Sequence, residues 1–294
     1  MLNPWIQAAR PKTLPAAVAP VLMATAIAWS DGTVAYVPAT ICLLFALLIQ
    51  IGTNFANDYF DFIKGADTAA RIGPTRMVAA GIIKPVAMRN AMAAVFATAF
   101  VVGCGLLPYG GWWLLTVGIA SVICGIAYTG GPYPLGYHGW GDVFVFIFFG
   151  LVAVCVTYYV QAGHFTLMTL LGGLATGALA TNILVVNNYR DMATDVVAGK
   201  RTLAVRFGRR VAARQYLAQL LIAQAVPLVW TLLDSRAWPS VLALAVLPRG
   251  LAVYRKLLAA TGREAFNEVL AGTALHYVLF TVLVCSGLVL AQWL

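Results

Sequence analysis

Long apolar stretches with few polar positions recur along the whole chain. Each is about 20 residues long, the length that an α-helix needs to cross the roughly 30 Å of hydrocarbon in a bilayer. The apolar residues do not alternate with polar ones, so the pattern favours helices over a transmembrane β-barrel. We predict a single all-α domain over residues 1–294 with nine membrane-spanning helices, at residues 14–30, 34–56, 82–107, 112–129, 142–161, 166–189, 211–232, 237–255 and 267–293.

The composition supports a membrane protein. Of 294 residues, 62% are hydrophobic and only 10% are charged, and the mean hydropathy is +0.86. Soluble domains carry about 25% charged residues, and a water-soluble chain of this size could not hide so much apolar surface. The same numbers exclude a disordered chain, a collagen and a coiled coil.

The net charge of +9 is distributed unevenly. Of the 19 Lys and Arg residues, all but Arg236 lie at the N-terminus or in the connections between spans 2 and 3, 6 and 7, and 8 and 9. By the positive-inside rule this side is cytoplasmic, so the charge sets orientation and does not indicate a nucleic-acid partner. With an odd number of spans, we expect a plasma (inner) membrane protein whose N-terminus is cytoplasmic and whose C-terminus is extracytoplasmic.

Small residues and cysteines have structural interpretations. Gly173-x-x-x-Gly177 in the sixth span predicts a close contact between two helices. The five cysteines are isolated inside apolar spans, and their spacing is not that of a metal site or a redox motif.

Acidic residues are rare, and most follow two cytoplasmic span ends. Residues four apart lie on one face of a helix, so oxygen-bearing side chains form one stripe after span 2, at Asn57 and Asp61, and another after span 6, at Asn187, Asp191 and Asp195. Ion pairing in a solvated loop would explain one such stripe. Two stripes of the same design at membrane-facing helix ends favour a functional site.

The chemistry of these stripes indicates a magnesium diphosphate site. Hard oxygen ligands without His or Cys suit Mg²⁺, which takes its remaining ligands from phosphates and water. We expect the metal ligands to come from Asn57, Asp58, Asp61, Asp67, Asn187, Asp191 and Asp195. The cations that would bind the free diphosphate oxygens are Arg10, Lys64, Arg71, Arg76, Lys200 and Arg201.

A diphosphate site at the membrane surface suggests a polyprenyl diphosphate substrate. The isoprenoid tail would run between the helices into a central cavity that opens to the cytoplasmic face. Ionisation of the allylic C–O bond would leave a carbocation, while Mg²⁺ and the cations stabilise the departing diphosphate. In this scheme we expect Asp61, Asp191, Asp195 and Lys200 to be catalytic.

Several motifs resemble those of the UbiA-type intramembrane aromatic prenyltransferases. The resemblance runs from Arg10 through the last span, with Asn57-x-x-x-Asp61 similar to the first Asp-rich motif of that family and Asp191-x-x-x-Asp195 similar to the second. The segments 52–61, 128–135 and 187–206 resemble the branch that acts on 1,4-dihydroxy-2-naphthoate. The resemblance implies nine helices, Mg²⁺, and C-prenylation of the naphthoate with loss of its carboxylate to give demethylmenaquinone.

The chain departs from the family pattern at two places. Asp67 lies six residues after Asp61 rather than four, which weakens its assignment as a metal ligand. Family members that use 4-hydroxybenzoate carry a Tyr with a Lys four residues later, whereas Tyr133 here is followed by Tyr137, which argues against that acceptor.

For the aromatic acceptor we expect contacts from Asn54, Tyr128, Tyr133 and Asp142. Asp142 could orient or deprotonate a naphthol hydroxyl, or it could instead cap the fifth span.

Other functions stay open from the sequence. A sibling prenyltransferase with another aromatic acceptor shares all these features. A secondary transporter of an anionic substrate would also contain acidic residues, but transporters place them near the bilayer midplane rather than at cytoplasmic helix ends. A phosphotransferase acting on CDP-alcohols would need an Asp-Gly-x-x-Ala-Arg pattern, which this sequence lacks.

Overall fold

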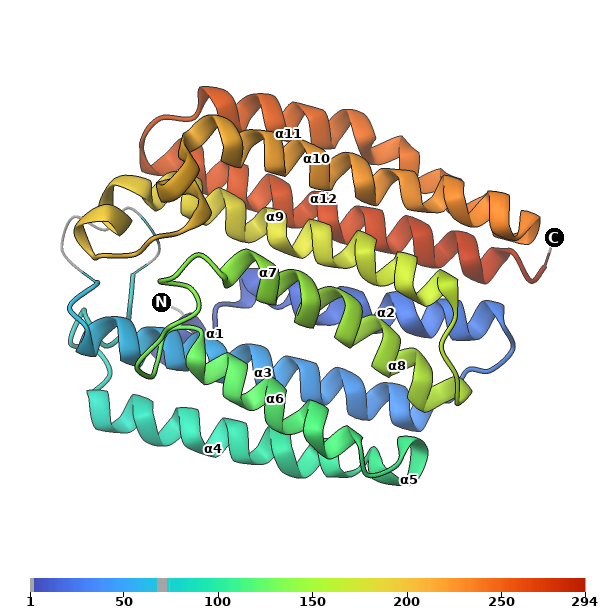
Figure 1. The fold of residues 1–294 in the computed structure, drawn as a ribbon, viewed down its shortest axis with the longest axis horizontal. Coiled ribbons are helices and arrows are strands. Elements are labelled where there is room, and N and C mark those ends of the chain that lie inside the picture. Colours follow the sequence, from blue (N-terminus) through green and yellow to red (C-terminus); the bar gives the residue numbers. More distant parts are fainter. Residues whose placement is uncertain (1–2, 68–72, 74, 294) are drawn as a thin grey trace.

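The computed structural model describes residues 3–67, 73 and 75–293, and within these residues every regular element is helical. Figure 1 shows the long helices side by side, with their axes close to one direction. In chain order the elements are α1 (Pro4–Ala9), η1 (Pro11–Thr13), α2 (Pro15–Ser30), α3 (Tyr36–Ile63), α4 (Pro85–Cys104), α5 (Leu107–Gly110), α6 (Leu114–Ala127), α7 (Gly141–Phe146), η2 (Ile147–Val152), α8 (Ala153–Ala162), α9 (Leu167–Val197), α10 (Leu203–Leu233), η3 (Ser235–Val246), α11 (Leu247–Ala259) and α12 (Gly262–Leu290).

Each apolar stretch predicted from the sequence coincides with a helix or with consecutive helical pieces. Six candidates among the described residues are long and apolar enough to cross a membrane: α3, α4, the α7–η2–α8 run, α9, α10 and α12. The first predicted span, residues 14–30, corresponds to α2, which meets the length and apolarity criteria only together with α1–η1, to which it is bent by 49°. Helix α6 is a shorter apolar helix. The all-helical class is thus confirmed, while the count of nine membrane crossings stays a prediction.

A glycine contact holds the π-helical stretch η2 against α9. A Cβ atom on Gly177 would lie 2.6 Å from the Phe146 carbonyl oxygen, and one on Gly173 would lie 2.9 Å from the Cα of Leu151. No side chain fits in that space, so the glycines let the two backbones approach closely. The contact predicted for Gly173-x-x-x-Gly177 is therefore confirmed.

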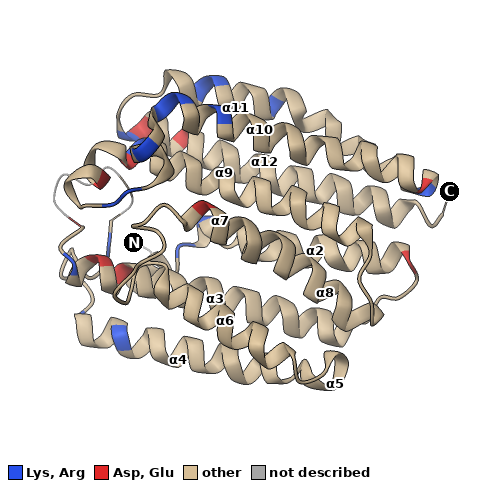
Figure 2. Ribbon diagram, in the orientation of Figure 1, with Lys and Arg blue, Asp and Glu red and all other residues tan. Residues whose placement is uncertain are grey.

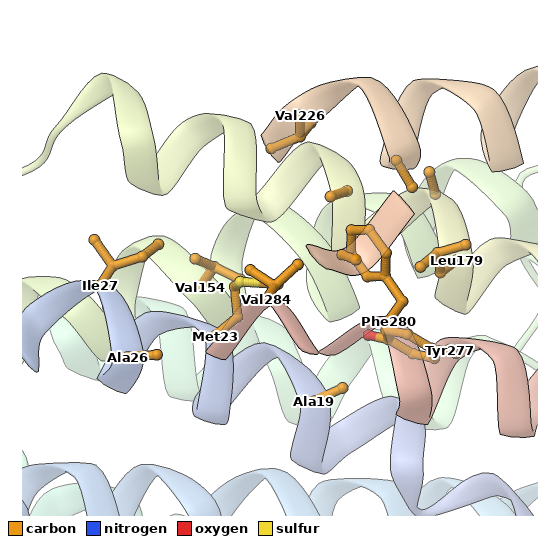
Figure 3. Close-up of a cluster of buried hydrophobic side chains, with 14 of the residues drawn as sticks. Ala19, Met23, Ala26, Ile27, Val154, Leu179, Val226, Tyr277, Phe280 and Val284 are labelled. Atoms are coloured by element: carbon orange, nitrogen blue, oxygen red, sulfur yellow. The ribbon is translucent and has the colours of Figure 1, made fainter. Parts of the chain in front are cut away.

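Helix α9 is the central helix of the bundle. In its most apolar stretch 78% of the residues are buried, against 22% in α4. The main cluster of buried side chains joins α9 to α2, α8, α10 and α12 and includes Met23, Ile27, Leu179 and Phe280 (Figure 3). This packing gives α9 a fixed position from which its last turns present polar residues.

Most charged residues lie at one end of the bundle, as the coloured ribbon in Figure 2 shows. We call this the charged end; it holds the last turns of α3 and α9 and the N-terminal helix α1. The opposite end, called here the far end, carries Asp31 and the Asp234–Arg236 ion pair, and the last residues of the chain lie there (Figures 1 and 2).

Candidate active site

Both acidic stripes lie inside helices rather than after them. The sequence placed the span ends at residues 56 and 189, but α3 continues to Ile63 and α9 to Val197. Each helix thus extends about two turns beyond its apolar part. The i, i+4 spacing is therefore a true helical spacing, and the oxygen-bearing side chains of each stripe share one face.

Asp61 of the first stripe is held by residues from three other segments. Its side chain is 2% exposed, and it accepts hydrogen bonds from the Arg76 guanidinium at 2.9 Å and from Lys200 Nζ at 3.1 Å. The Tyr137 hydroxyl donates a third, at 2.7 Å. Because Lys200 follows the second stripe, this ion pair joins α3 to the end of α9.

The other acids after α3 are engaged differently. Both carboxylate oxygens of Asp58 accept backbone N–H groups, from Met77 at 3.0 Å and Val78 at 3.1 Å. Asp67 is paired with Arg76 Nε at 3.5 Å. Asp58 therefore anchors the turn that begins at Met77, whereas Asp67 shares Arg76 with Asp61.

Around the second stripe, Asp191 is paired with its own neighbour. The Arg190 guanidinium donates two hydrogen bonds to the Asp191 carboxylate, both at 2.7 Å. Asp195 is buried one turn further along, and the Asn187 side-chain amide donates to the Ile183 carbonyl at 3.1 Å. The Asp191 side chain keeps 15% of its surface exposed and so faces the charged end more openly than Asp61 does.

Two lysines expected to bind diphosphate converge on Tyr137. Lys64 Nζ lies 4.8 Å and Lys200 Nζ 4.6 Å from the centre of its ring. Burial, together with the positive charge of Lys200, lowers the pKa of Lys64, and Asp61 opposes the shift. Burial and the charge of Asp61 raise the pKa of the Tyr137 phenol, so it stays a neutral donor.

The remaining predicted cations are spread around this point. Arg10 lies between α1 and η1 with a left-handed backbone (φ 52°), and Arg201 is exposed beside Lys200. Arg71 lies outside the described residues.

The loop between α6 and α7 connects the polar site to an apolar cavity. The Thr129 hydroxyl donates to the Asn57 side-chain oxygen at 2.9 Å, and its carbonyl accepts from Lys64 Nζ at 2.6 Å. The preceding residue, Tyr128, lines a cavity of about 140 Å³. The cavity therefore begins within one residue of the charged groups.

The cavity runs along the bundle between α3, α6 and the α7–η2–α8 run. Its α3 wall is a stripe from Cys42 to Thr53, and its α6 wall extends from Leu114 to Tyr128. At 1.5 Å per residue the α6 wall is about 20 Å long. Its lining is almost entirely apolar, so it suits a hydrocarbon chain.

Asp142 is held at the charged end of this cavity by two amides that the sequence analysis missed. It is 5% exposed in the first turn of α7. Gln215 of α10 donates to one carboxylate oxygen at 3.0 Å, and Asn188 of α9 donates to the other at 3.5 Å. Only the packing of α7 against α9 and α10 reveals this contact. A Cβ on the adjacent Gly141 would lie 3.0 Å from the Tyr128 hydroxyl, so Tyr128 and Asp142 are neighbours.

Two expected acceptor contacts lie elsewhere. The Asn54 amide donates to the Ala9 carbonyl at 2.9 Å and contacts the Thr13 hydroxyl at 3.1 Å, so it fastens the N-terminal segment to α3. Tyr133 is 54% exposed and stacks on His138 with a ring separation of 3.7 Å. Of the four residues, only Tyr128 and Asp142 are brought together.

The donor set fits Mg²⁺ bound partly through a substrate. Among the described residues, no three His, Cys, Asp or Glu side chains are placed to hold a metal by themselves. Mg²⁺ commonly binds through one or two carboxylates together with phosphate oxygens. The Asp61 carboxylate and the Asp191 and Asp195 pair supply oxygen ligands of that type on two helices.

Comparison with known proteins agrees with this geometry. The model of the UbiA prenyltransferase family matches residues 17–271. The chain is 37% identical over 289 residues to the 1,4-dihydroxy-2-naphthoate octaprenyltransferase of Mycobacterium tuberculosis, covering 98% of this chain and 97% of that one. It is 36% identical to the enzyme of the same name from Escherichia coli, with 98% and 96% covered.

Solved structures show the same fold. A UbiA homolog from Archaeoglobus fulgidus bound to DMAPP and Mg²⁺ superposes with a TM-score of 0.66 at 14% identity, over 97% of this chain and 99% of that one. The apo UbiA homolog from Aeropyrum pernix K1 gives a TM-score of 0.68 at 14% identity, over 99% and 100% of the two chains. The family match over most of the chain, together with these relatives, establishes that the protein belongs to the UbiA prenyltransferase family.

Proposed function

We propose that the protein transfers a polyprenyl group from polyprenyl diphosphate to 1,4-dihydroxy-2-naphthoate. One observation supports the proposal: Asp61 of the first stripe is ion-paired with Lys200, which follows the second stripe, next to the charged end of an apolar cavity. The relatives named for this reaction match nearly the whole chain, which supports the naphthoate as acceptor.

In this proposal the polar site binds the diphosphate. Lys64, Lys200 and Arg76 lie closest to Asp61 and would bind phosphate oxygens, with Arg10, Arg71 and Arg201 around them. Mg²⁺ would be held by Asp61, Asp191 and Asp195, assisted by the amide oxygens of Asn57 and Asn187, and would neutralise charge on the leaving diphosphate.

The tail of the donor would occupy the apolar cavity, which places its first isoprene unit near Tyr128 and Thr129. The allylic C–O bond breaks and the diphosphate leaves with the electron pair. A ring carbon of the naphthoate forms the new C–C bond to the allylic cation, and the carboxylate leaves as carbon dioxide. The products of this step are the hydroquinone form of demethylmenaquinone, carbon dioxide and diphosphate, which balance the two substrates. Conversion of the hydroquinone to demethylmenaquinone is a separate two-electron oxidation by an external electron acceptor.

Asp142 is our candidate for orienting or deprotonating a hydroxyl of the acceptor. Both its oxygens are held by neutral amides. These hydrogen bonds orient the carboxylate, which could then accept a proton from a hydroxyl of the acceptor. Tyr128, beside it, would contact the ring of the acceptor, and the more distant Asn54 and Tyr133 would act at the edge of that site.

The same proposal gives the orientation in the membrane. The charged end carries the cations and would face the cytoplasm. The far end, with the C-terminal residues, would then be extracytoplasmic, in a plasma (inner) membrane crossed nine times.

The test is a product analysis. Membranes containing the protein are incubated with polyprenyl diphosphate, Mg²⁺ and a panel of phenolic acids that includes 1,4-dihydroxy-2-naphthoate and 4-hydroxybenzoate. We expect a prenylated, decarboxylated product from the naphthoate alone, identified by mass, and none when Mg²⁺ is chelated. Prenylation of 4-hydroxybenzoate instead would reassign the acceptor, and no product from any acid would exclude the transferase function.

A further inference from the structure

We propose that Tyr137 is a positioning residue that holds Lys64, Lys200 and Asp61 in place before the donor binds; this inference rests on the proposed function. Two ammonium groups lie near the centre of the ring, Lys64 Nζ at 4.8 Å and Lys200 Nζ at 4.6 Å. Lys64 directly follows α3, and Lys200 follows α9. One side chain therefore contacts a lysine from each half of the site.

The hydroxyl group adds a third contact. It donates to Asp61 Oδ1 at 2.7 Å, and the same oxygen accepts from Lys200 at 3.1 Å. The Tyr137 side chain thus contacts both lysines and the Asp61 carboxylate, whose negative charge stabilises them. Without these contacts, two like charges this close would repel each other, and their long side chains would move apart.

The backbone fixes where this side chain stands. The Tyr137 carbonyl accepts the Arg201 backbone N–H at 2.7 Å, and the Arg206 guanidinium donates to the His138 carbonyl at 2.8 Å. The loop that carries Tyr137 is therefore attached to the segment that carries Lys200. Its position depends on contacts between distant parts of the chain, as expected for a residue that aligns them.

An aromatic ring suits this task better than a second carboxylate. The face of a ring attracts an ammonium group without accepting its N–H donors in strong hydrogen bonds. Lys64 and Lys200 therefore keep donors available for phosphate oxygens. A lysine at position 137 would instead add a third positive charge beside these two.

The experiment compares two substitutions of Tyr137. Tyr137→Phe keeps the ring and loses the hydroxyl, whereas Tyr137→Leu loses both. In purified protein we measure binding of inorganic diphosphate by calorimetry, and KM for polyprenyl diphosphate and kcat by product formation. We expect Tyr137→Leu to bind diphosphate about tenfold more weakly and to raise KM by a similar factor, because two cation–π contacts are lost.

The Phe variant separates positioning from general structure. We expect it to bind diphosphate within about threefold of the wild type, since both cation–π contacts remain and Asp61 keeps its ion pairs with Arg76 and Lys200. Tyr36→Leu, which changes an exposed tyrosine at the far end of α3, is the matched control and should leave both measurements unchanged. If Tyr137→Leu does not fold, Tyr137→Met replaces it, because Met keeps the apolar volume without a ring.

Two results would overturn the inference: wild-type diphosphate binding in the ring-less variant, or equal losses in the Phe and ring-less variants. Failure of the proposed function looks different. If the wild type makes no prenylated naphthoate, the acceptor assignment is wrong, while the diphosphate-binding comparison still decides the role of Tyr137.

Discussion

The two acidic stripes share a sequence spacing but differ in their surroundings. Asp61 on α3 is 2% exposed and is held by Arg76, Lys200 and Tyr137, all from other segments. Asp191 on α9 is 15% exposed and is paired with the preceding residue, Arg190. A repeated motif therefore does not imply a repeated role: the first carboxylate joins distant parts of the chain, and the second is held locally.

The largest loss of activity is expected from a substitution of Asp61. Asp61→Asn removes a magnesium ligand in our proposal, together with the carboxylate paired with Lys200 and one of the two carboxylates paired with Arg76. We expect prenyl transfer to fall by at least about 10³-fold, and the free energy of unfolding to fall by about 3 kcal/mol because a buried ion pair is broken. Product formation and denaturant unfolding in detergent measure the two effects. Asp234→Asn at the far end is the control, and turnover within tenfold of the wild type would contradict the role of Asp61.

Lengthening each acid by one methylene group tests the comparison directly. Asp61→Glu must fit among three fixed partners, whereas Asp191→Glu can extend toward the open side of the site. A displacement of about 1 Å in a catalytic group can cost 10²-fold in rate, so we expect about that loss for Asp61→Glu and roughly a tenth of it for Asp191→Glu. Initial rates at saturating substrates give the answer. Equal losses would show that the two stripes are equivalent after all.

The smallest loss of activity is expected at Asp58, which lies about one turn before Asp61 on α3 and accepts backbone N–H groups. Asp58→Ala leaves the N–H groups of Met77 and Val78 buried without an acceptor, which costs about 1–3 kcal/mol of unfolding free energy. We expect turnover of the folded protein to change less than tenfold. Complete loss of turnover at unchanged stability would instead make Asp58 a metal ligand.

The fold was largely predictable because apolar stretches determine where helices cross a bilayer. Their polar ends were less predictable: hydropathy stops at residues 56 and 189, but the hydrogen-bonded helices continue through Asp61 and Asp195. Apolarity reports where lipid contacts the chain, not where helical backbone ends. The sequence therefore placed these acids after the spans, whereas the structure has them within the helices.

The contacts between segments could not be read from the sequence. Asn188 and Gln215 support Asp142 only because α7 packs against α9 and α10, and Tyr137 meets Lys64 only because its loop reaches across to α3. Asn54 was expected near the acceptor, yet its amide binds the N-terminal segment. A polar side chain on a helix can bind a ligand or form hydrogen bonds to a neighbouring helix. Only the packing of the helices distinguishes these two roles.

The short wall of the apolar cavity has a consequence for the product. The α6 wall is about 20 Å long, less than the roughly 30 Å of the hydrocarbon layer, so a polyprenyl tail longer than this wall ends among lipid acyl chains. The protein would then bind the donor through its diphosphate and first isoprene units and would not select for the length of the remaining tail. The length of the quinone side chain would accordingly be decided earlier, by whichever elongating enzyme builds the donor.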